Sequence, residues 1–199
     1  MAHSIFLRGV GDTLIEMTER PYDSESLLQK LLADYPALLA GDQVDDAAPR
    51  RWVLIKREAI VPDREGSTGR WSIDHVFLDQ DGIPVEVKRS TDTRIRREMI
   101  GQMLDYAANA LAYWPVDHLR ATFEAGCEQR TVDSHAVLRD AFGDVDVDAF
   151  WHTVKTNLQA GRLRLVFVAD QIPLELRRVV EFLNQQMAGV CSCGLSEWQ

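Results

Sequence analysis

The sequence predicts an α/β domain built around a mixed β-sheet. Three apolar segments of strand length lie within residues 51–89, and segments with helical periodicity flank them on both sides. A further strongly apolar strand at 162–170 follows only after a long helical stretch, so it must return to the sheet by a crossover connection. With 199 residues, 46% of them hydrophobic, the chain is expected to form a single domain over residues 1–199.

The elements before the first long strand are short. Residues 12–19 are typical of a short leading strand. Residues 22–39 predict a helix, because the four leucines between positions 27 and 32 form one apolar stripe. Pro36 ends the regular helical pattern, and residues 41–50 have the composition of a loop.

The remaining elements follow in order along the chain. They are strands at 51–61, 71–79 and 83–89, a helix at 93–114, helical segments within 116–160, a strand at 162–170 and a helix at 173–187. The tail after residue 187 is either irregular or an added edge strand. The predicted order is therefore helix, three strands, helix, helical insertion at about 116–160, strand and helix, with antiparallel hairpins first and the crossover strand later.

Composition and charge limit the class of protein. The net charge of −9 argues against a protein that coats nucleic acid through general basicity, although it leaves room for a local basic patch. No apolar run approaches the roughly 18 residues of a membrane helix. The first residues lack the layout of a signal peptide, and three cysteines suit a reducing compartment better than a disulfide framework. We expect a cytoplasmic protein with no membrane partner.

The strand at 83–89 carries two charged residues, Glu86 and Lys88, on one face. The segment Gln80-Asp81-Gly82 fits a three-residue turn in which Gly82 supplies the positive φ. That turn would place Val76 opposite Glu86 and Asp74 opposite Lys88, so Asp74 and Glu86 would be diagonal neighbours, about 7–8 Å apart at the backbone. A turn of even length without a bulge would put them on opposite faces of the sheet.

Two helices add polar residues to this face. Glu25 lies at the edge of the apolar stripe of the first helix, and Gln102 and Tyr106 share one face of the helix at 93–114. Burying several charges costs several kcal/mol unless ion pairs or a bound cation compensate them. Oxygen ligands without a nearby His or Cys favour Mg²⁺ or Mn²⁺.

In this order, the motifs resemble the signature of the PD-(D/E)XK nuclease superfamily. Asp74 stands for the motif aspartate, with Ile73 in place of the preceding proline, and Glu86-Val87-Lys88 supplies the E-x-K triplet. Glu25 is similar to the first motif, and Gln102-x-x-x-Tyr106 resembles the auxiliary motif of the RecB-like and restriction-endonuclease-like branches. The resemblance covers about residues 22–187, interrupted by the 116–160 insertion, and extends to small prokaryotic members of this superfamily.

The resemblance implies a restriction-endonuclease-like core (α-β-β-β-α-β) and metal-dependent hydrolysis of phosphodiester bonds, with DNA as the expected substrate. It implies that Asp74, Glu86 and the Val87 carbonyl ligate Mg²⁺ or Mn²⁺, with Glu25 reaching the ion directly or through water. Lys88 would position the attacking water and stabilise the transition state. Gln102 and Tyr106 would orient the lysine, the water or the nucleic-acid backbone. A role in defence, repair or mobile elements fits such an enzyme, and a homodimer is an arrangement that the resemblance allows.

A run of basic residues follows the E-x-K triplet. Lys88 is succeeded by Arg89, Arg94, Arg96 and Arg97, with Asp92 as the acidic residue among them. Basic residues beside the proposed site would bind a phosphate backbone without regard to sequence. The alternative is a solvated helix face.

Each motif also has a structural reading. Asp74, Glu86 and Lys88 are compatible with a salt bridge across a hairpin. The alternative function is therefore a catalytically silent module, built on the same fold, that binds nucleic acid or a partner. A third class is an oligomerisation or regulatory subunit, which a large apolar patch in the 116–160 segment would indicate. His75, which points away from Asp74, is expected to face the core or an interface and not to bind a metal.

Overall fold

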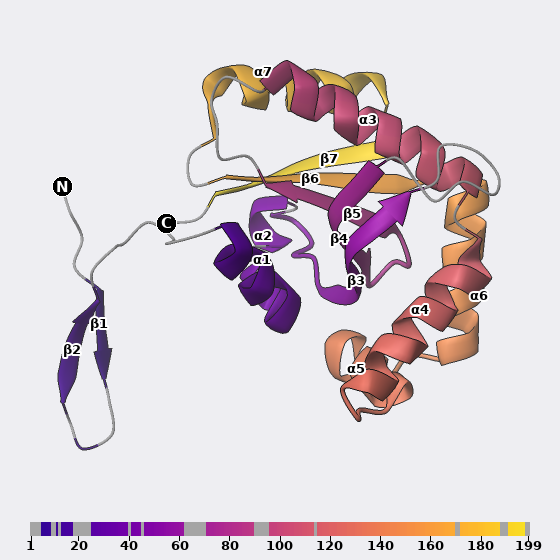
Figure 1. Cartoon of the computed structure of the whole chain (residues 1–199). Coiled ribbons are helices and arrows are strands. Elements are labelled where there is room, and N and C mark those ends of the chain that lie inside the picture. Colours follow the sequence, from indigo (N-terminus) through magenta and orange to yellow (C-terminus); the bar gives the residue numbers. More distant parts are fainter. Residues whose placement is uncertain are drawn as a thin grey trace.

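The computed structural model describes residues 5–8, 11, 13–17, 25–39, 41–44, 46–61, 71–89, 96–113, 115–169, 172–187 and 191–197. These residues form a five-stranded sheet and a separate hairpin (Figure 1). The predicted α/β class with a mixed sheet is confirmed. The strands of the sheet are β3 (Trp52–Val61), β4 (Trp71–Asp79), β5 (Pro84–Arg89), β6 (Leu163–Ala169) and β7 (Cys191–Glu197), and the hairpin strands are β1 (Ile5–Arg8) and β2 (Leu14–Met17).

The strands of the sheet lie in chain order, β3-β4-β5-β6-β7. β4 pairs antiparallel with both β3 and β5, whereas β6 pairs with β5, and β7 with β6, in parallel. The crossover into β6 is the predicted one, because parallel neighbours cannot be joined by a tight turn. β7 is an edge strand, which is one of the two possibilities that the sequence left open for the tail after residue 187.

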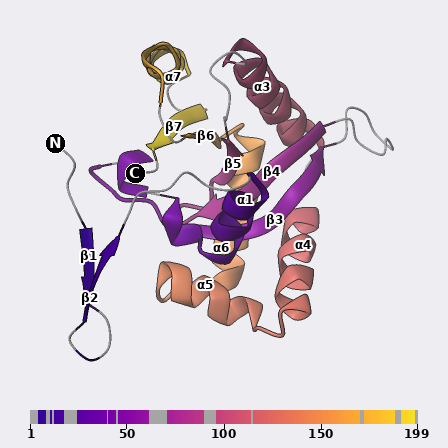
Figure 2. The ribbon, with the colours of Figure 1, turned by 60° about the vertical axis from the view of Figure 1, so that its left-hand side comes forward.

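Helices cover both faces of the sheet (Figures 1 and 2). They are α1 (Glu25–Asp34), the 3₁₀ helix η1 (Pro36–Leu38), α2 (Gly41–Val44), α3 (Arg96–Tyr113), α4 (Val116–Gln129), α5 (Ser134–Phe142), α6 (Val147–Gln159) and α7 (Leu174–Gln186). The segment predicted as a helical insertion contains α4, α5 and α6. Asp133 and Asp146 cap α5 and α6 by accepting hydrogen bonds from backbone N–H groups, the arrangement typical of an N-cap aspartate.

The sheet separates two apolar cores. The larger core joins α3, α4, α6 and α7 to one face of the sheet and includes Val76, Met103 and Leu165. The smaller core joins α1 and Leu39, the residue after η1 (Pro36–Leu38), to the other face and includes Leu28, Val85 and Val87. Alternate residues of β5 therefore face different cores, as the period of a strand requires.

One local prediction needs correction, and one strand was not predicted. Residues 41–50 are not wholly loop, because Gly41–Val44 form the short helix α2. The leading strand predicted at 12–19 is β2, and it pairs with β1, a four-residue strand that the sequence did not predict because it is too short to show a clear alternation. Among the described helices, none has the combination of length and apolarity that crossing a membrane requires.

Candidate functional site

The turn between β4 and β5 sets the register of the candidate site. Gly82 has a φ of +68°, and the N–H of Asp79 donates a hydrogen bond of 3.1 Å to the carbonyl oxygen of Ile83. Val76 lies opposite Glu86. The three-residue turn and the register predicted from it are thus confirmed. Continuing this register by one residue places position 88 opposite Asp74.

Asp74 and Glu86 are two buried carboxylic residues on neighbouring strands. Asp74 is 9% exposed and Glu86 is 2% exposed. Both positions share a face with Val76, since Asp74 is two residues from Val76 and Glu86 lies directly opposite it. Their backbones are consequently diagonal neighbours, about 7–8 Å apart, and side chains at such positions come within reach of one small cation.

The helix α3 covers this face of the sheet. Met103 is fully buried in the larger core, and Ala107, one turn later, is 8% exposed. Gln102 is half-buried on the same helix. The side chain of Tyr106 lies outside the described residues, so its predicted position beside Gln102 stays a prediction.

The helix α1 lies on the other face. Its Leu28 and Leu32 belong to the smaller core together with Val87. Leu39, which follows η1, lies near the β4–β5 turn, because Trp52, the cross-strand partner of Asp79, donates a hydrogen bond of 2.7 Å from its Nε1 to the Leu39 carbonyl. The helix α1 thus packs on the sheet face opposite Asp74 and Glu86, and the side chain of Glu25, its first residue, lies outside the described residues, so its approach to the ion stays a prediction.

A hydrogen-bonded group connects α1 to the strands next to Asp74. The Nε2–H of His75 donates to the backbone carbonyl of Gln29 at 2.8 Å, and Arg57, the cross-strand partner of His75, donates to the Gln29 side chain at 3.3 Å. His75 is 1% exposed and stacks on Phe77. Burial lowers its pKa, so the ring is neutral near pH 7. The prediction that His75 faces the core is confirmed.

Several predicted site residues lie outside the described part of the chain. They are Arg94 and the side chains of Glu25, Lys88, Arg89, Arg96, Arg97 and Tyr106. Among the side chains that the structure does describe, no group of three or more His, Cys, Asp or Glu residues could hold a metal ion. The described oxygen donors are thus the Asp74 and Glu86 carboxylates, which suit a hard divalent cation. Val87 has strand neighbours on both sides, His75 and Val166, so its carbonyl lies in the plane of the sheet and stays a predicted ligand.

A buried ion pair lies at the other end of β4, and the sequence did not predict it. Asp79 is fully buried and accepts hydrogen bonds of 3.3 and 3.2 Å from Nε and Nη2 of Arg164 on β6. It also accepts from the backbone N–H groups of Asp81 and Ile83 at 3.0 and 2.8 Å. Burial raises the pKa of Asp79 despite these contacts. The pair fixes the start of the turn that sets the site register.

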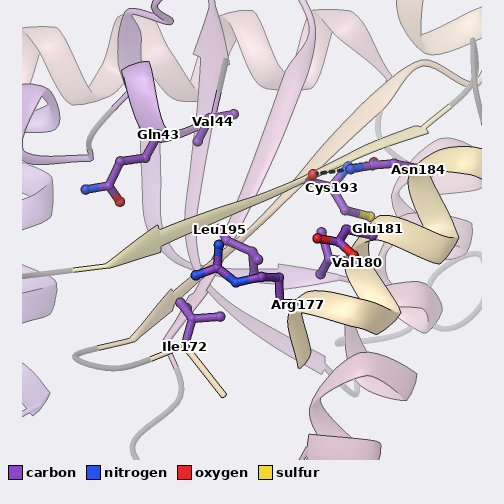
Figure 3. Close-up of a pocket in the computed structure, with 9 residues that line it drawn as sticks. All are labelled: Gln43, Val44, Ile172, Arg177, Val180, Glu181, Asn184, Cys193 and Leu195. Atoms are coloured by element: carbon purple, nitrogen blue, oxygen red, sulfur yellow. Dashed lines mark hydrogen bonds between the residues drawn. The ribbon is translucent and has the colours of Figure 1, made fainter. Parts of the chain in front are cut away.

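A cavity of about 390 Å³ lies elsewhere, between α2, α7 and β7 (Figure 3). Arg177 and Glu181 border it on α7, and the amide of Asn184 bonds both the N–H and the carbonyl of Cys193 on β7. None of the predicted site residues lines this cavity.

The described residues thus define an α/β protein with a pair of buried carboxylic residues on one face of a central hairpin. No protein-family model matches the chain, and no curated protein does. A crystal structure of a repair endonuclease from Pyrococcus abyssi is similar at 14% sequence identity with a TM-score of 0.39, over 92% of this chain and 51% of that one. This chain spans about half the length of that protein. A TM-score of this size does not fix the fold, so any function must be argued from this chain's own residues.

Proposed function

We propose that this protein is a metal-dependent nuclease that hydrolyses phosphodiester bonds in DNA, built on a restriction-endonuclease-like core. The observation that carries the proposal is the placement of Asp74 and Glu86. Both carboxylic residues are buried on one face of neighbouring strands, and the register puts the lysine at position 88 opposite Asp74. A buried carboxylate pair beside a lysine position supports the interpretation of Glu86-Val87-Lys88 as an E-x-K motif.

The proposed roles are those that the resemblance to the PD-(D/E)XK nucleases implies. Asp74 and Glu86 hold Mg²⁺ or Mn²⁺, supported by the Val87 carbonyl and by Glu25 directly or through water. When bound, such an ion lowers the pKa of a coordinated water and offsets the charge that builds on the phosphate. Lys88 positions the attacking water, and Gln102 and Tyr106 orient the lysine or the substrate.

The basic run supports a nucleic-acid substrate. Arg89 ends β5, and Arg96 and Arg97 begin α3, so both elements bring arginine positions toward the connection between them. Arg94 belongs to that connection in the sequence. Arginines placed there bind phosphates of the DNA backbone, which gives affinity that falls as salt concentration rises.

Cleavage assays on duplex, single-stranded and supercoiled DNA test this function. We expect cleavage with Mg²⁺ or Mn²⁺, none with EDTA, and a loss of about 100-fold or more in rate for Lys88→Ala, comparable to removing one transition-state contact. Asp74→Asn should lose Mn²⁺ binding, measured by titration calorimetry. The matched control is Asp144→Asn, since Asp144 is an exposed carboxylic residue in the loop before α6.

The outcomes separate the two candidate functions. DNA binding without cleavage under any metal, unchanged by Lys88→Ala, would identify a catalytically silent binding module. Cleavage that survives both Lys88→Ala and Asp74→Asn would place the activity elsewhere and contradict the proposed site.

A further inference from the structure

The last strand of the sheet, β7, has one edge that faces away from the other strands. β7 lies beside β6, and within the described part of the chain no second strand pairs with it. The backbone N–H and C=O groups of successive residues in a strand point alternately to its two edges. The outer edge of β7 therefore presents hydrogen-bonding groups with which a further strand can pair.

The side chain of Asn184 identifies the residues of β7 that face this outer edge. Its amide donates to the Cys193 carbonyl at 2.8 Å and accepts from the Cys193 N–H at 2.6 Å. Both backbone groups of Cys193 thus point away from β6, and the alternation places the N–H and C=O of Leu195 at the same edge. None of the described residues hydrogen-bonds these two groups of Leu195. Asn184 takes the place of a neighbouring strand at Cys193, and the position at Leu195 is available to a ligand.

The outer edge of β7 borders the cavity of about 390 Å³ between α2, α7 and β7 (Figure 3). Leu195 lines the cavity from the strand, Val44 from α2 and Val180 from α7. Val44 packs against the smaller core and Val180 belongs to the larger core, so the two helices lie on opposite faces of the sheet. They form two walls on either side of the strand edge, and we call this space the β7 groove. An extended chain beside β7 would lie between these walls.

The α7 wall of the β7 groove carries two opposite charges. Arg177 and Glu181 are both exposed, and because they are four residues apart they share one side of the helix, about 6 Å apart along its axis. Alternate residues of an extended strand recur on one face at a similar interval of roughly 6–7 Å. An acidic and a basic residue two positions apart on a bound strand therefore match Arg177 and Glu181. The α2 wall offers Val44, which suits an apolar residue between them.

We propose that the β7 groove binds an extended segment of a partner protein, which adds to the five-stranded sheet as a sixth strand. The segment exchanges backbone hydrogen bonds with Leu195, and these supply affinity without regard to its sequence. The acidic and basic residues that face α7 contact Arg177 and Glu181, and the apolar residue between them faces Val44. None of the proposed metal ligands lines the groove, so the proposal is independent of the nuclease activity.

A short synthetic peptide, acetyl-Thr-Glu-Val-Lys-Thr-amide, tests strand addition in an NMR titration of the whole chain. We expect saturable binding with a Kd of about 1 mM or tighter, and a shift of the Leu195 amide signal. The same peptide is then N-methylated at either Val or Lys, whose N–H groups point to opposite edges of the peptide strand. One of the two methyl groups should weaken binding about tenfold, because it removes a hydrogen bond to β7, and the other should change it little. No binding of the parent peptide, or equal effects of the two methyl groups, would overturn the proposal.

Variants of the chain test the two parts of the β7 groove. Leu195→Pro removes the outward N–H but leaves the pairing with β6, because an edge strand accepts proline where the N–H faces outward. It should weaken peptide binding about tenfold. Glu181→Gln should weaken binding about threefold, as the loss of an exposed ion pair does. The matched control is Glu175→Gln, since Glu175 is exposed on α7 but does not line the groove, and it should bind like the wild type.

Circular dichroism checks that each variant folds. If Leu195→Pro does not fold, the methylated peptides decide the backbone contact, because they are measured on the unchanged chain. Equal binding by Glu181→Gln and Glu175→Gln would contradict the charge match with α7. Full binding by folded Leu195→Pro would show that the peptide does not pair with β7.

Discussion

At the scale of single residues, Asp79 and Arg164 show how a buried ion pair supports a neighbouring site. The two residues come from β4 and β6, on either side of β5, and Asp79 also accepts two backbone hydrogen bonds of the turn. Sequence analysis assigned Asp79 to a strand end but had no means of pairing it with a residue 85 positions later. Such pairs depend on which strands become neighbours, which local patterns do not specify.

Removing Arg164 alone should lower the free energy of unfolding more than removing both charges of the Asp79–Arg164 pair. Arg164→Met leaves the Asp79 carboxylate buried without its guanidinium, so we expect a loss of about 3–5 kcal/mol in the free energy of unfolding. Asp79→Asn combined with Arg164→Met should recover part of that loss, because the Asn oxygen still accepts the turn N–H groups and no charge is stranded. Urea unfolding measures both variants. Arg139→Met, an exposed arginine, is the control and should change stability little.

His75 should give the protein a pH-dependent stability. Burial lowers its folded-state pKa, whereas the unfolded pKa is about 6.5. Protons therefore bind the unfolded state more readily. The stability that the neutral, buried His75 ring contributes is complete above about pH 6.5 and declines as the pH falls toward the folded-state pKa.

The measurement is urea unfolding at pH 7.5 and pH 5.5. His75→Gln keeps a donor for the Gln29 carbonyl but cannot titrate, so it should lose less stability than the wild type between the two pH values. His118→Gln, an exposed histidine, should follow the wild type. Equal pH dependence in all three proteins would contradict the assignment.

At the scale of elements, the β4–β5 turn is held from outside by α6. Asn157, 4% exposed, donates from its side chain to the carbonyls of Asp81 and Gly82 at 2.9 and 3.0 Å. A Cβ on Gly82 would lie 3.2 Å from Val154 of the same helix, and the φ of +68° disfavours any other residue. The helix from the 147–159 region therefore restrains the turn that sets the register of Asp74 and Glu86.

Breaking this restraint should destabilise the turn. Asn157→Leu leaves two carbonyls without their donor, so we expect a loss of about 1–3 kcal/mol in the free energy of unfolding. Thr156→Ala removes a neighbouring exposed side chain that bonds only within α6, and it should stay within about 0.5 kcal/mol of the wild type. Amide hydrogen exchange should show faster exchange of the Ile83 and Gly82 N–H groups in the Asn157 variant alone.

The contrast between this turn and α1 shows what local patterns can specify. The three-residue turn with Gly82 predicted the strand register, because loop length and a required positive φ leave few alternatives. The leucine stripe of α1 predicted a buried side of the helix but not which face of the sheet it packs on. The contact of α1 with the smaller core around Val87, on the sheet face opposite Glu86, depends on the assembled fold.

At the scale of the whole molecule, the candidate site lies on β4 and β5, two strands of the sheet that separates the two apolar cores. Asp74 and Glu86 face the larger core, while the intervening residues of the same strands, His75 and Val87, face the side of α1. An ion that binds both carboxylates would consequently connect neighbouring strands in the middle of the sheet. Binding that requires the folded chain stabilises the entire fold, and not the hairpin alone.

Divalent metal should therefore raise the melting temperature. At a free concentration of 100 times the dissociation constant, a ligand specific for the folded state contributes about 2.7 kcal/mol. For a chain of this length, each kcal/mol corresponds to roughly 2–4 °C, so Mn²⁺ should raise the wild-type Tm by about 5–10 °C. Differential scanning calorimetry with Mn²⁺ and with EDTA measures the shift. Asp144→Asn should retain it and Asp74→Asn should lose it, because only the latter removes a proposed ligand. A shift of the same size in Asp74→Asn would mean that the ion binds away from the β4–β5 hairpin.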